Sequence, residues 1–558
     1  MTPFDLTHRL QGRLEGDVVD SQEEREKYSR DTSLFKRVPS SVVYPKHAKD
    51  VSQLVKTISE LKAEGHDISL TARAAGTCMS GGSLTTSVVA VFTKYCNKII
   101  SVERSETNKR EGYATVEPGC YYRDFEKATL EKNLILPSYP ASKSICALGG
   151  IVNNDSGGER TLEYGKTHDY IEAVDVVLSD GTITTFSALT EEEVEKKKAL
   201  QNFEGKIYRE MSALLKDHGE RIQKAKPRVS KNSAGYALWD IIDPVAKTMN
   251  LAKLICGAQG TLAMVTQAKL RLIKPQPYRA MLVVFMKDLE TLPEVVARVL
   301  KSNPESFESY DDHTFKLALR FLPQMLSQMG LVKAARLGLS FLPEVGMVLT
   351  GGVPKLVLMA EFSEDTHEEA VRRAKEAHEA LADMNLPTKV LETEAASEKY
   401  WIVRRESFAL LRKNLSGYYA APFIDDFVVS PKDYPTFLPK LNALMSEYDL
   451  IYTMAGHIGN GNFHIIPLMD LSKPETRKII LGLSPRVYDL VIEHGGTTTG
   501  EHNDGIIRTP YLSQLFGADM VDLFNQTKDI FDPQNIFNPG KKVHGTFADI
   551  ERDIITKS

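Results

Sequence analysis

Two histidines, His457 and His464, lie seven residues apart in the segment AGHIGNGNFHIIP, with three glycines and two asparagines between or beside them. On an α-helix this spacing would separate them by about 10 Å along the axis. One metal ion could not reach both, because its nitrogen ligands each lie about 2 Å away. A glycine-rich turn can fold the chain so that the two imidazoles meet. The segment therefore predicts either a tight loop joining two strands or one half of a metal site.

A second segment, GGTTTGEHNDGI, also contains residues that could take part in chemistry, the adjacent Glu501 and His502. In an extended segment adjacent side chains point to opposite sides, so one can bind a metal while its neighbour faces a substrate. His457, His464 and Glu501 are therefore predicted to form a set of two histidines and one carboxylate. Such a set suits a divalent cation with open positions for substrate oxygens, and the sequence does not choose between zinc, manganese and iron.

Two glycine-rich loops could hold a phosphate-containing cofactor. RAAGTCMSGGS, at residues 73–83, follows a predicted strand and can direct backbone N–H groups at a phosphate. Residues 136–171 contain a second loop with two glycine pairs. Together the loops could clamp a long dinucleotide from both sides, although two structural turns are the alternative. The GxGxxG spacing of a Rossmann fold is absent.

Composition narrows the class of protein. With 558 residues the chain is long enough for two or three domains, and its net charge of −5 does not indicate nucleic acid as a partner. The five cysteines form no CxxC pair, which excludes the usual zinc ribbon and iron–sulfur ligand runs and indicates reduced thiols. The N-terminal segment has no signal-peptide pattern, and no run of 18 apolar residues occurs. We expect a cytoplasmic protein.

The elements that would position these residues follow an α+β pattern. Residues 40–76 predict strand, helix and strand, and residues 170–186 predict a hairpin that turns at Asp180-Gly181. A charged stretch at 189–227 predicts solvated helices with the ion pairs Glu192/Lys196 and Glu193/Lys197. The prolines at 275 and 277 mark a domain boundary, after which strands alternate with long helices.

The segment at 321–350 carries only three charged residues and is interrupted by two prolines, so it is too broken to span a bilayer. A buried helical pair is the favoured interpretation. The alternative is an amphipathic patch on a membrane surface, which would place the protein peripherally on the inner face of the membrane.

Several motifs in one order resemble a known family. YxxDxS, PxxVVYP, RAAGTCMSGG, ALGGIVNNDSGG and GAQGTLAMVT resemble the PCMH-type FAD-binding domain of the vanillyl-alcohol-oxidase superfamily, and GHIGNGNFH, TTTGEH and FDPQNIFNPGK resemble the C-terminal domain of FAD-linked oxidases. This branch includes D-lactate dehydrogenases, glycolate oxidase flavin subunits and D-2-hydroxyglutarate dehydrogenases. The resemblance covers about residues 28–543.

The resemblance implies an α+β fold with a two-subdomain FAD-binding domain. An α+β substrate (cap) domain with an antiparallel sheet would follow, and a C-terminal segment would return to the flavin. The expected parts are an N-terminal segment 1–37, the FAD-binding domain 38–275, the cap domain 276–495 with an apolar insertion at about 315–353, and a C-terminal segment 496–558.

The resemblance also implies contacts with FAD. Thr77 stands where relatives with covalent flavin often carry histidine, so we expect FAD to be bound non-covalently. Gln259 stands where many relatives carry glutamate. The implied flavin contacts are Ala74, Ala75, Gly76, Thr77, Cys78, Met79, Ser80, Gly81, Gly82, Pro140, Ala141, Ser142, Gly149, Gly150, Asn153, Asn154, Ser156, Gly157, Gly158, Gly260, Val265 and Asn538.

The resemblance assigns the substrate chemistry as well. In metal-dependent relatives the histidine after the glutamate, here His502, is the base, and Arg404 matches the arginine that holds the substrate carboxylate, with Arg405 as the alternative. The expected reaction is loss of the hydroxyl proton to His502 and of hydride to the flavin. The hydroxyglutarate enzymes carry a lysine and an asparagine at positions that match the vicinity of Tyr419 and Ile466. These departures favour a small monocarboxylate such as D-lactate over a dicarboxylate.

Three alternatives stay open. The chain could act on glycolate or D-2-hydroxyglutarate, or serve as the flavin subunit of a larger redox complex. Electrons would leave to a quinone, an electron-transfer flavoprotein, a cytochrome or a separate iron–sulfur protein. The sequence also leaves open a homodimer.

Overall fold

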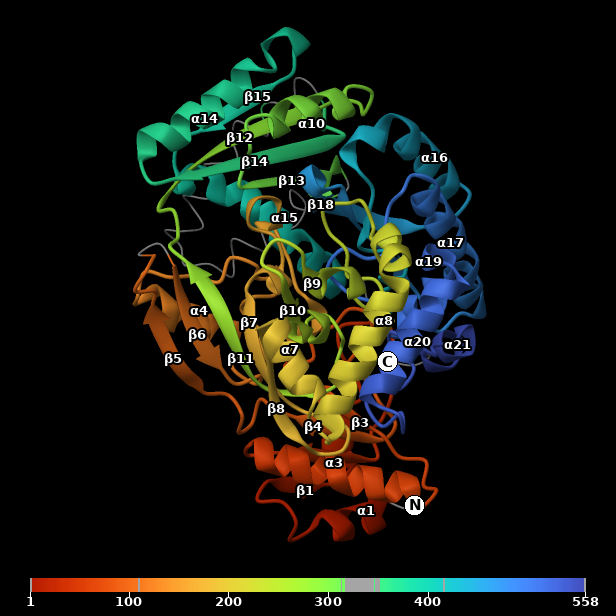
Figure 1. Ribbon diagram of the computed structural model, residues 1–558. Coiled ribbons are helices and arrows are strands. Elements are labelled where there is room, and N and C mark those ends of the chain that lie inside the picture. Colours follow the sequence, from red (N-terminus) through yellow and green to blue (C-terminus); the bar gives the residue numbers. More distant parts are fainter. Residues whose placement is uncertain are drawn as a thin grey trace.

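The computed structural model describes residues 3–108, 111–312, 314–316, 346, 352–414 and 417–555. Its strands form three sheets, and helices lie between and around them (Figure 1). The predicted α+β architecture, with an antiparallel sheet in the second half of the chain, is confirmed.

The first sheet has four strands in the order β1-β2-β4-β3. Strands β2, β4 and β3 are parallel, whereas β1 is antiparallel to β2. Helix α3 (Ala48–Ala63) connects β2 to β3 and buries an apolar stripe against the sheet, as the helical spacing predicted. The strands are β1 (Asp17–Val19), β2 (Ser41–Tyr44), β3 (Leu70–Arg73) and β4 (Val88–Val91).

The second sheet is antiparallel and has seven strands in the order β5-β6-β11-β7-β8-β10-β9. The predicted hairpin is its β7–β8 pair, and Gly181 supplies the positive φ of 84° in the turn. The strands are β5 (Ile99–Arg104), β6 (Glu111–Val116), β7 (Ile171–Val177), β8 (Ile183–Thr190), β9 (Ile242–Asp243), β10 (Thr248–Asn250) and β11 (Met264–Ile273).

Two charged helices, α7 (Glu191–Lys198) and α8 (Phe203–Ala225), follow this hairpin. Of the two predicted ion pairs, Glu192–Lys196 forms. The other was wrong, because Glu193 accepts the N–H of Thr190 in a capping box while Lys197 pairs with Glu204 of the next helix. The carboxylate of Glu193 therefore caps the N-terminus of its helix instead of pairing with Lys197, as the helical spacing had predicted.

The third sheet is antiparallel and begins at β12, after the prolines that follow β11. Its order is β15-β12-β14-β13-β18-β19-β16, and β17 also pairs with β19. Helices α10 and α14 cover one face, and α15 contacts β12 and β15. The strands are β12 (Tyr278–Met286), β13 (Ser306–Asp311), β14 (Leu356–Glu364), β15 (Thr388–Leu391), β16 (Tyr419–Ala420), β17 (Phe427–Val428), β18 (Ile451–His457) and β19 (Asn462–Met469).

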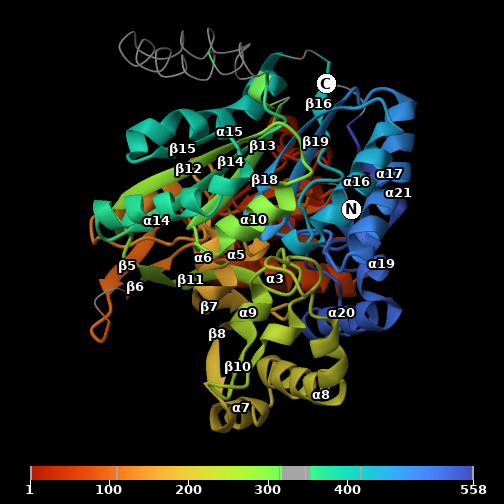
Figure 2. The ribbon, with the colours of Figure 1, turned by 90° about the horizontal axis from the view of Figure 1, so that it is seen from above.

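The C-terminal helices return from the third sheet toward the first two, as Figure 2 shows in blue. Asn538, beyond α20, donates hydrogen bonds to the backbone oxygens of Gly82 (2.8 Å) and Gln259 (2.7 Å). The remaining α-helices are α1 (Pro3–Leu10), α2 (Gln22–Lys27), α4 (Tyr122–Leu130), α5 (Leu148–Asn154), α6 (Thr161–Tyr164), α9 (Leu251–Ile255), α10 (Leu292–Leu300), α14 (His367–Glu379), α15 (Glu394–Asn414), α16 (Tyr434–Ser446), α17 (Pro474–Glu493), α18 (Gly505–Arg508), α19 (Leu512–Phe516), α20 (Ala518–Phe531) and α21 (Phe547–Asp553).

The apolar segment 321–350, for which a helical pair or a membrane contact was predicted, lies outside the described residues except for Gly346. Among the helices that are described, none combines the length and the apolar character needed to cross a membrane.

Candidate active site

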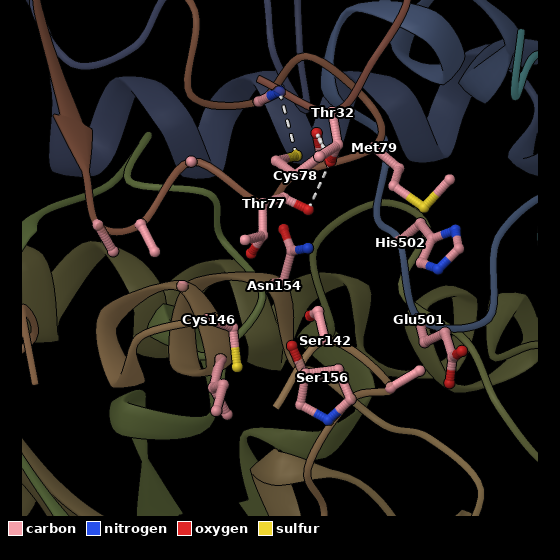
Figure 3. Close-up of a pocket in the computed structure, with 18 of the residues that line it drawn as sticks. Thr32, Thr77, Cys78, Met79, Ser142, Cys146, Asn154, Ser156, Glu501 and His502 are labelled. Atoms are coloured by element: carbon pink, nitrogen blue, oxygen red, sulfur yellow. Dashed lines mark hydrogen bonds between the residues drawn. The ribbon is translucent and has the colours of Figure 1, made fainter. Parts of the chain in front are cut away.

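A cavity of about 420 Å³ lies where the three sheets and the C-terminal segment meet. This volume falls in the usual range of ligand pockets, about 300–1,000 Å³. Figure 3 shows that its walls come from segments far apart in the sequence. Thr77 and Cys78 lie on one side, Ser142, Asn154 and Ser156 face them, and Glu501 and His502 lie at one end.

Both glycine loops line this cavity. Four of the residues expected to contact the flavin do not line it, and they brace its walls instead. The backbone oxygen of Gly158 accepts a hydrogen bond from Nζ of Lys231. The side-chain amide of Asn538 donates to the backbone oxygens of Gly82 and Gln259. The other two are Ser80 and Gly81, which pack against Ile506 through a backbone hydrogen bond and van der Waals contact respectively.

The loops are held by hydrogen bonds that leave space for a ligand. The hydroxyl of Thr32 donates to the backbone oxygens of Thr77 (2.8 Å) and Cys78 (2.9 Å). A Cβ added at Gly150 would have only the Ala74 methyl within 4 Å, at 3.9 Å, so this glycine borders open space. The absence of side chains there fits a cofactor that approaches the backbone closely, as the pyrophosphate of FAD would.

The segment that holds the two histidines is a β-hairpin, so the predicted tight loop joining two strands is confirmed, and the metal site stays a prediction. Strands β18 and β19 are joined by a 3₁₀ turn at Ile458–Asn460, and Gly461 has a φ of 73°. A Cβ at Gly461 would overlap the backbone oxygen of Val429, so the turn requires glycine. The imidazoles of His457 and His464 are brought to a centroid separation of 5.1 Å with their planes nearly perpendicular.

Glu501 completes the predicted set. Its Oε1 lies 3.1 Å from Nε2 of His457 and 3.3 Å from Nε2 of His464. Its other oxygen, Oε2, lies 3.1 Å from Nζ of the fully buried Lys231. Oε1 of Glu501 is thus close to Nε2 of both histidines, while Lys231 pairs with its other oxygen.

Two buried carboxylates fix the orientation of the histidines. Oε1 of Glu308 lies 2.6 Å from Nδ1 of His457, and Oδ1 of Asp425 lies 3.0 Å from Nδ1 of His464. When Nδ1 carries the proton, Nε2 of each ring has a lone pair available for a cation. The arrangement fits a divalent metal ion bound by His457, His464 and Glu501.

The charge of this cluster also favours a cation. Burial opposes ionisation of Glu501, yet the Lys231 ammonium and His457 hold its pKa well below the usual range. Burial would lower the pKa of His464, but the charge of Asp425 and hydrogen bonds to Asp425 and Glu501 raise it to about 10. In the absence of a metal, a proton is the cation that these carboxylates attract.

Asp426 also lies near this cluster, since one atom each of Asp426, His464, Glu501 and His502 lies within 4.8 Å of the others. Its carboxylate is already occupied, because it accepts the backbone N–H groups of Glu501 and His502 and the side-chain N–H of Asn462. We therefore assign Asp426 a role in holding the loop rather than a metal ion.

The expectation that Glu501 and His502 point to opposite sides was wrong. Their donor atoms lie within 4.8 Å of each other in this cluster. The chain forms a bend here instead of an extended strand, and Asn503 has a φ of 66°. Nδ1 of His502 lies 2.7 Å from Oδ2 of Asp425, and its ring stacks on His464 at 5.1 Å. His502 nevertheless lines the cavity.

Arg404 and Arg405 both line the cavity from helix α15. Nη2 of Arg404 lies 3.2 Å from Oε2 of Glu308, and its buried Nε has no hydrogen-bond partner among the described residues. Arg405 pairs with Glu159 at 2.6 Å and lies over the ring of Trp401. The side chain of Arg404 is therefore more deeply buried than that of Arg405.

Four residues of the cluster were not identified from the sequence: Lys231, Glu308, Asp425 and Asp426. The only sequence signal for Asp425 is an acidic pair between apolar residues in the segment APFIDDFVV, where a charged pair would otherwise be costly to bury. Lys231 and Glu308 lie in polar segments that carry no comparable signal.

Comparisons with known families agree with this geometry. Residues 39–187 match the family model described as an FAD binding domain, and residues 275–542 match that of the C-terminal domain of FAD linked oxidases. Two solved structures have a similar fold over nearly all of this chain at 16% identity. They are 4-ethylphenol oxidase from Gulosibacter chungangensis (TM-score 0.67, covering 98% of both chains) and p-cresol methylhydroxylase (TM-score 0.67, covering 97% of both).

Curated relatives are 25% identical to the chain. They include a D-2-hydroxyglutarate dehydrogenase of Haemophilus influenzae, aligned over 95% of this chain and 50% of that protein. They also include the glycolate oxidase subunit GlcD of Bacillus subtilis (94% and 93%) and a D-lactate dehydrogenase of Archaeoglobus fulgidus (90% and 91%). The chain spans about half the length of the first group of D-2-hydroxyglutarate dehydrogenases that it matches.

Proposed function

Because the chain is a flavoprotein built from the FAD-binding and C-terminal domains of FAD-linked oxidases, we propose that it oxidises a D-2-hydroxy acid to the 2-oxo acid. The favoured substrate is a small monocarboxylate such as D-lactate. The observation that carries this proposal is the convergence of His457, His464 and Glu501 in the same cavity as the two glycine loops.

The residues of the cavity divide the chemistry between them. Bound FAD would accept the hydride from Cα, and a bound divalent cation would lower the pKa of the substrate hydroxyl. Arg404 offers a guanidinium to the substrate carboxylate. His502, held through Nδ1 by Asp425, has Nε2 available to accept the hydroxyl proton.

The strand register supports a small, apolar substrate side chain. Ala455 is paired with His464, and Thr453 is paired with Ile466. Because alternate residues of a strand share one face, Ile466 lies on the same side of β19 as the metal-binding His464. Ala420, Thr453, Ala455 and Ile466 all line the cavity. A substrate chelated near His464 would thus have its side chain over small or apolar groups.

A second candidate substrate is D-2-hydroxyglutarate. Arg405 lines the cavity beside Arg404 and could meet a second carboxylate, and several relatives bear the name of this activity. Glycolate, which lacks a side chain, would also fit beside the small and apolar residues that line this part of the cavity. The chain could also act as the flavin subunit of a larger redox complex.

A substrate screen tests the proposed function. The purified, metal-loaded protein would be mixed anaerobically with both enantiomers of lactate and 2-hydroxyglutarate and with glycolate, and flavin bleaching would be followed. D-Lactate should bleach the flavin faster than the other acids, and L-lactate should not. If no 2-hydroxy acid bleaches it, the proposed function is wrong, and fastest bleaching by D-2-hydroxyglutarate would transfer the assignment to that substrate.

Substitution of Ile466 should shift the substrate preference. Ile466→Asn introduces an amide two residues after His464, where the hydroxyglutarate enzymes are expected to carry asparagine. We expect kcat/KM for D-2-hydroxyglutarate relative to D-lactate to rise by about 10-fold, which corresponds to about 1.4 kcal/mol from one added hydrogen bond. Ile466→Val is the matched control and should leave the ratio near that of the wild type. A ratio unchanged by Asn would show that Ile466 does not face the substrate side chain.

The flavin should be held without a covalent bond. The cavity carries Thr77 where a histidine would be needed for attachment, so acid precipitation should release FAD into the supernatant. The absorbance of the supernatant and of the redissolved pellet measures the partition. A yellow pellet would contradict the expectation and direct attention to Cys78 and Cys146, which also line the cavity.

For the electron acceptor we propose a non-nicotinamide partner: a quinone, an electron-transfer flavoprotein, a cytochrome or a separate iron–sulfur protein. The purified chain and an artificial dye together would support turnover if the chain is self-sufficient in the reductive half-reaction. Dependence on an added subunit for flavin bleaching would instead favour the assembly role.

A further inference from the structure

One buried carboxylate joins a metal-binding residue to the residue assigned as the base. Asp425 is fully buried, and its two oxygens have different partners. Oδ1 lies 3.0 Å from Nδ1 of His464, and Oδ2 lies 2.7 Å from Nδ1 of His502. The two rings stack with an interplanar angle of 27°. Asp425 thus contacts both imidazoles in the same way.

The surrounding backbone keeps this carboxylate in place. The buried Arg508 donates to the backbone oxygens of Asp425 (2.7 Å) and Asn503 (3.1 Å). The neighbouring Asp426, with a φ of 72°, accepts the backbone N–H groups of Glu501 and His502. The loop that supplies Asp425 and the loop that supplies His502 are therefore fastened to each other by charge-assisted hydrogen bonds.

We propose that Asp425 is a positioning residue that sets the tautomer of both His464 and His502. With Nδ1–H of each ring donated to Asp425, the Nε2 lone pair of His464 is available to the metal and that of His502 to the substrate hydroxyl. This inference rests on the proposed function for the role of His502. Asp425 itself is not among the residues that line the cavity.

Glu308 provides the contrast that isolates this effect. It also holds a metal-binding imidazole, His457, through Nδ1, but its second oxygen contacts Arg404 rather than the base. Loss of either carboxylate should therefore weaken metal binding. Only loss of Asp425 should also disturb the group that accepts the proton.

Asp425→Asn is the informative substitution. Asparagine has only one acceptor oxygen, whereas the Nδ1–H groups of His464 and His502 need one each. Its NH₂ group must therefore donate to Nδ1 of one ring. The proton of that ring then moves to Nε2. In the FAD-loaded full-length protein we expect Zn²⁺ affinity, measured by calorimetry, to fall by about 10–100-fold. At saturating Zn²⁺ and D-lactate, the limiting rate of flavin reduction should fall by at least about 10-fold.

Glu308→Gln is the matched control. Its Zn²⁺ affinity should fall by a similar factor, but at saturating Zn²⁺ and substrate the limiting rate should fall less than that of Asp425→Asn, because Glu308 contacts His457 and not His502. Any remaining defect should appear as weaker substrate binding, because Arg404 loses its partner. If Glu308→Gln lowers the limiting rate as much as Asp425→Asn, the assignment of Asp425 to the base is wrong.

A double substitution gives a second criterion. In a His502→Asn background, Asp425→Asn should lower the limiting rate no further than about twofold, because the group that it positions is gone, while Zn²⁺ affinity should still fall. Independent, multiplicative losses of rate would overturn the proposal. Asp425→Ser, which also offers a single acceptor and is smaller, carries the same expectations if the asparagine variant fails to retain FAD.

The two proposals can fail separately. The calorimetric titration uses Zn²⁺ alone with the resting flavoprotein, so it reports on His464 even if no 2-hydroxy acid is a substrate. Unchanged Zn²⁺ affinity in Asp425→Asn would overturn the positioning role. Absence of flavin reduction by every acid in the wild type would overturn the proposed function and, with it, the role of Asp425 toward His502.

Discussion

His502→Asn should retain bound metal and FAD yet lose most flavin reduction by substrate. Loss of a general base typically slows a reaction by about 10²–10⁴-fold, and asparagine cannot accept a proton at neutral pH. The imidazole contacts Asp425 but is not one of the three convergent ligands, so metal binding should persist. Stopped-flow measurement of flavin bleaching, with metal and FAD quantified in the same preparation, is the direct assay.

The pH dependence separates a base from a binding residue. Residual reduction by His502→Asn should rise with pH, because hydroxide can substitute for the imidazole. His494→Asn is a matched control, since that histidine binds the backbone oxygen of Leu490 in helix α17 and does not line the cavity. A His502→Asn variant that bleaches as fast as wild type at neutral pH would remove His502 from the mechanism.

His457→Ala and His464→Ala should each lose metal and most activity while keeping FAD. Each substitution removes one of three convergent ligands, whereas the glycine loops that line the flavin part of the cavity belong to other segments. We expect metal affinity and turnover each to fall by at least about 100-fold, consistent with the sensitivity of metal sites to loss even of outer partners. Metal content after dialysis and the flavin spectrum measure the two properties independently.

Two outcomes would contradict this expectation in different ways. Full metal content and turnover in either variant would show that the ion, if any, is bound elsewhere. Loss of FAD together with metal would show that the hairpin supports the flavin loops, so that the loss of activity would not identify a ligand. His494→Ala controls for removal of an imidazole outside the cavity.

The parts of the site that depend on short segments could be predicted from the sequence. The hairpin that holds His457 and His464 has its turn residues within itself, and Gly461 could be recognised because a turn of this kind needs a positive φ. The glycine loops were likewise recognisable by composition. By contrast, the expectation for Glu501 and His502 assumed an extended strand, and a local bend made it wrong.

The charged partners of the proposed metal ligands could not be predicted in the same way. Glu308 meets His457 across 149 residues of sequence, and Lys231 meets Glu501 across 270. Such partners are determined by how the sheets and loops pack, and one sequence does not reveal which distant charges meet. Asn538 illustrates the same limit, since its hydrogen bonds to the backbone of Gly82 and Gln259 join segments hundreds of residues apart.

The position of Asn538 has a consequence for the biosynthesis of the protein. Its amide joins the loop that contains Gly82 to the one that contains Gln259, and Glu501 and His502 form one end of the same cavity. A ribosome makes the chain from the N-terminus, and early domains commonly fold first. The first glycine loop is therefore synthesised more than 400 residues before the residue that braces it. Until Asn538 has emerged, the nascent chain lacks a complete cradle, so we expect stable capture of FAD only after the segment that contains Asn538 has been synthesised.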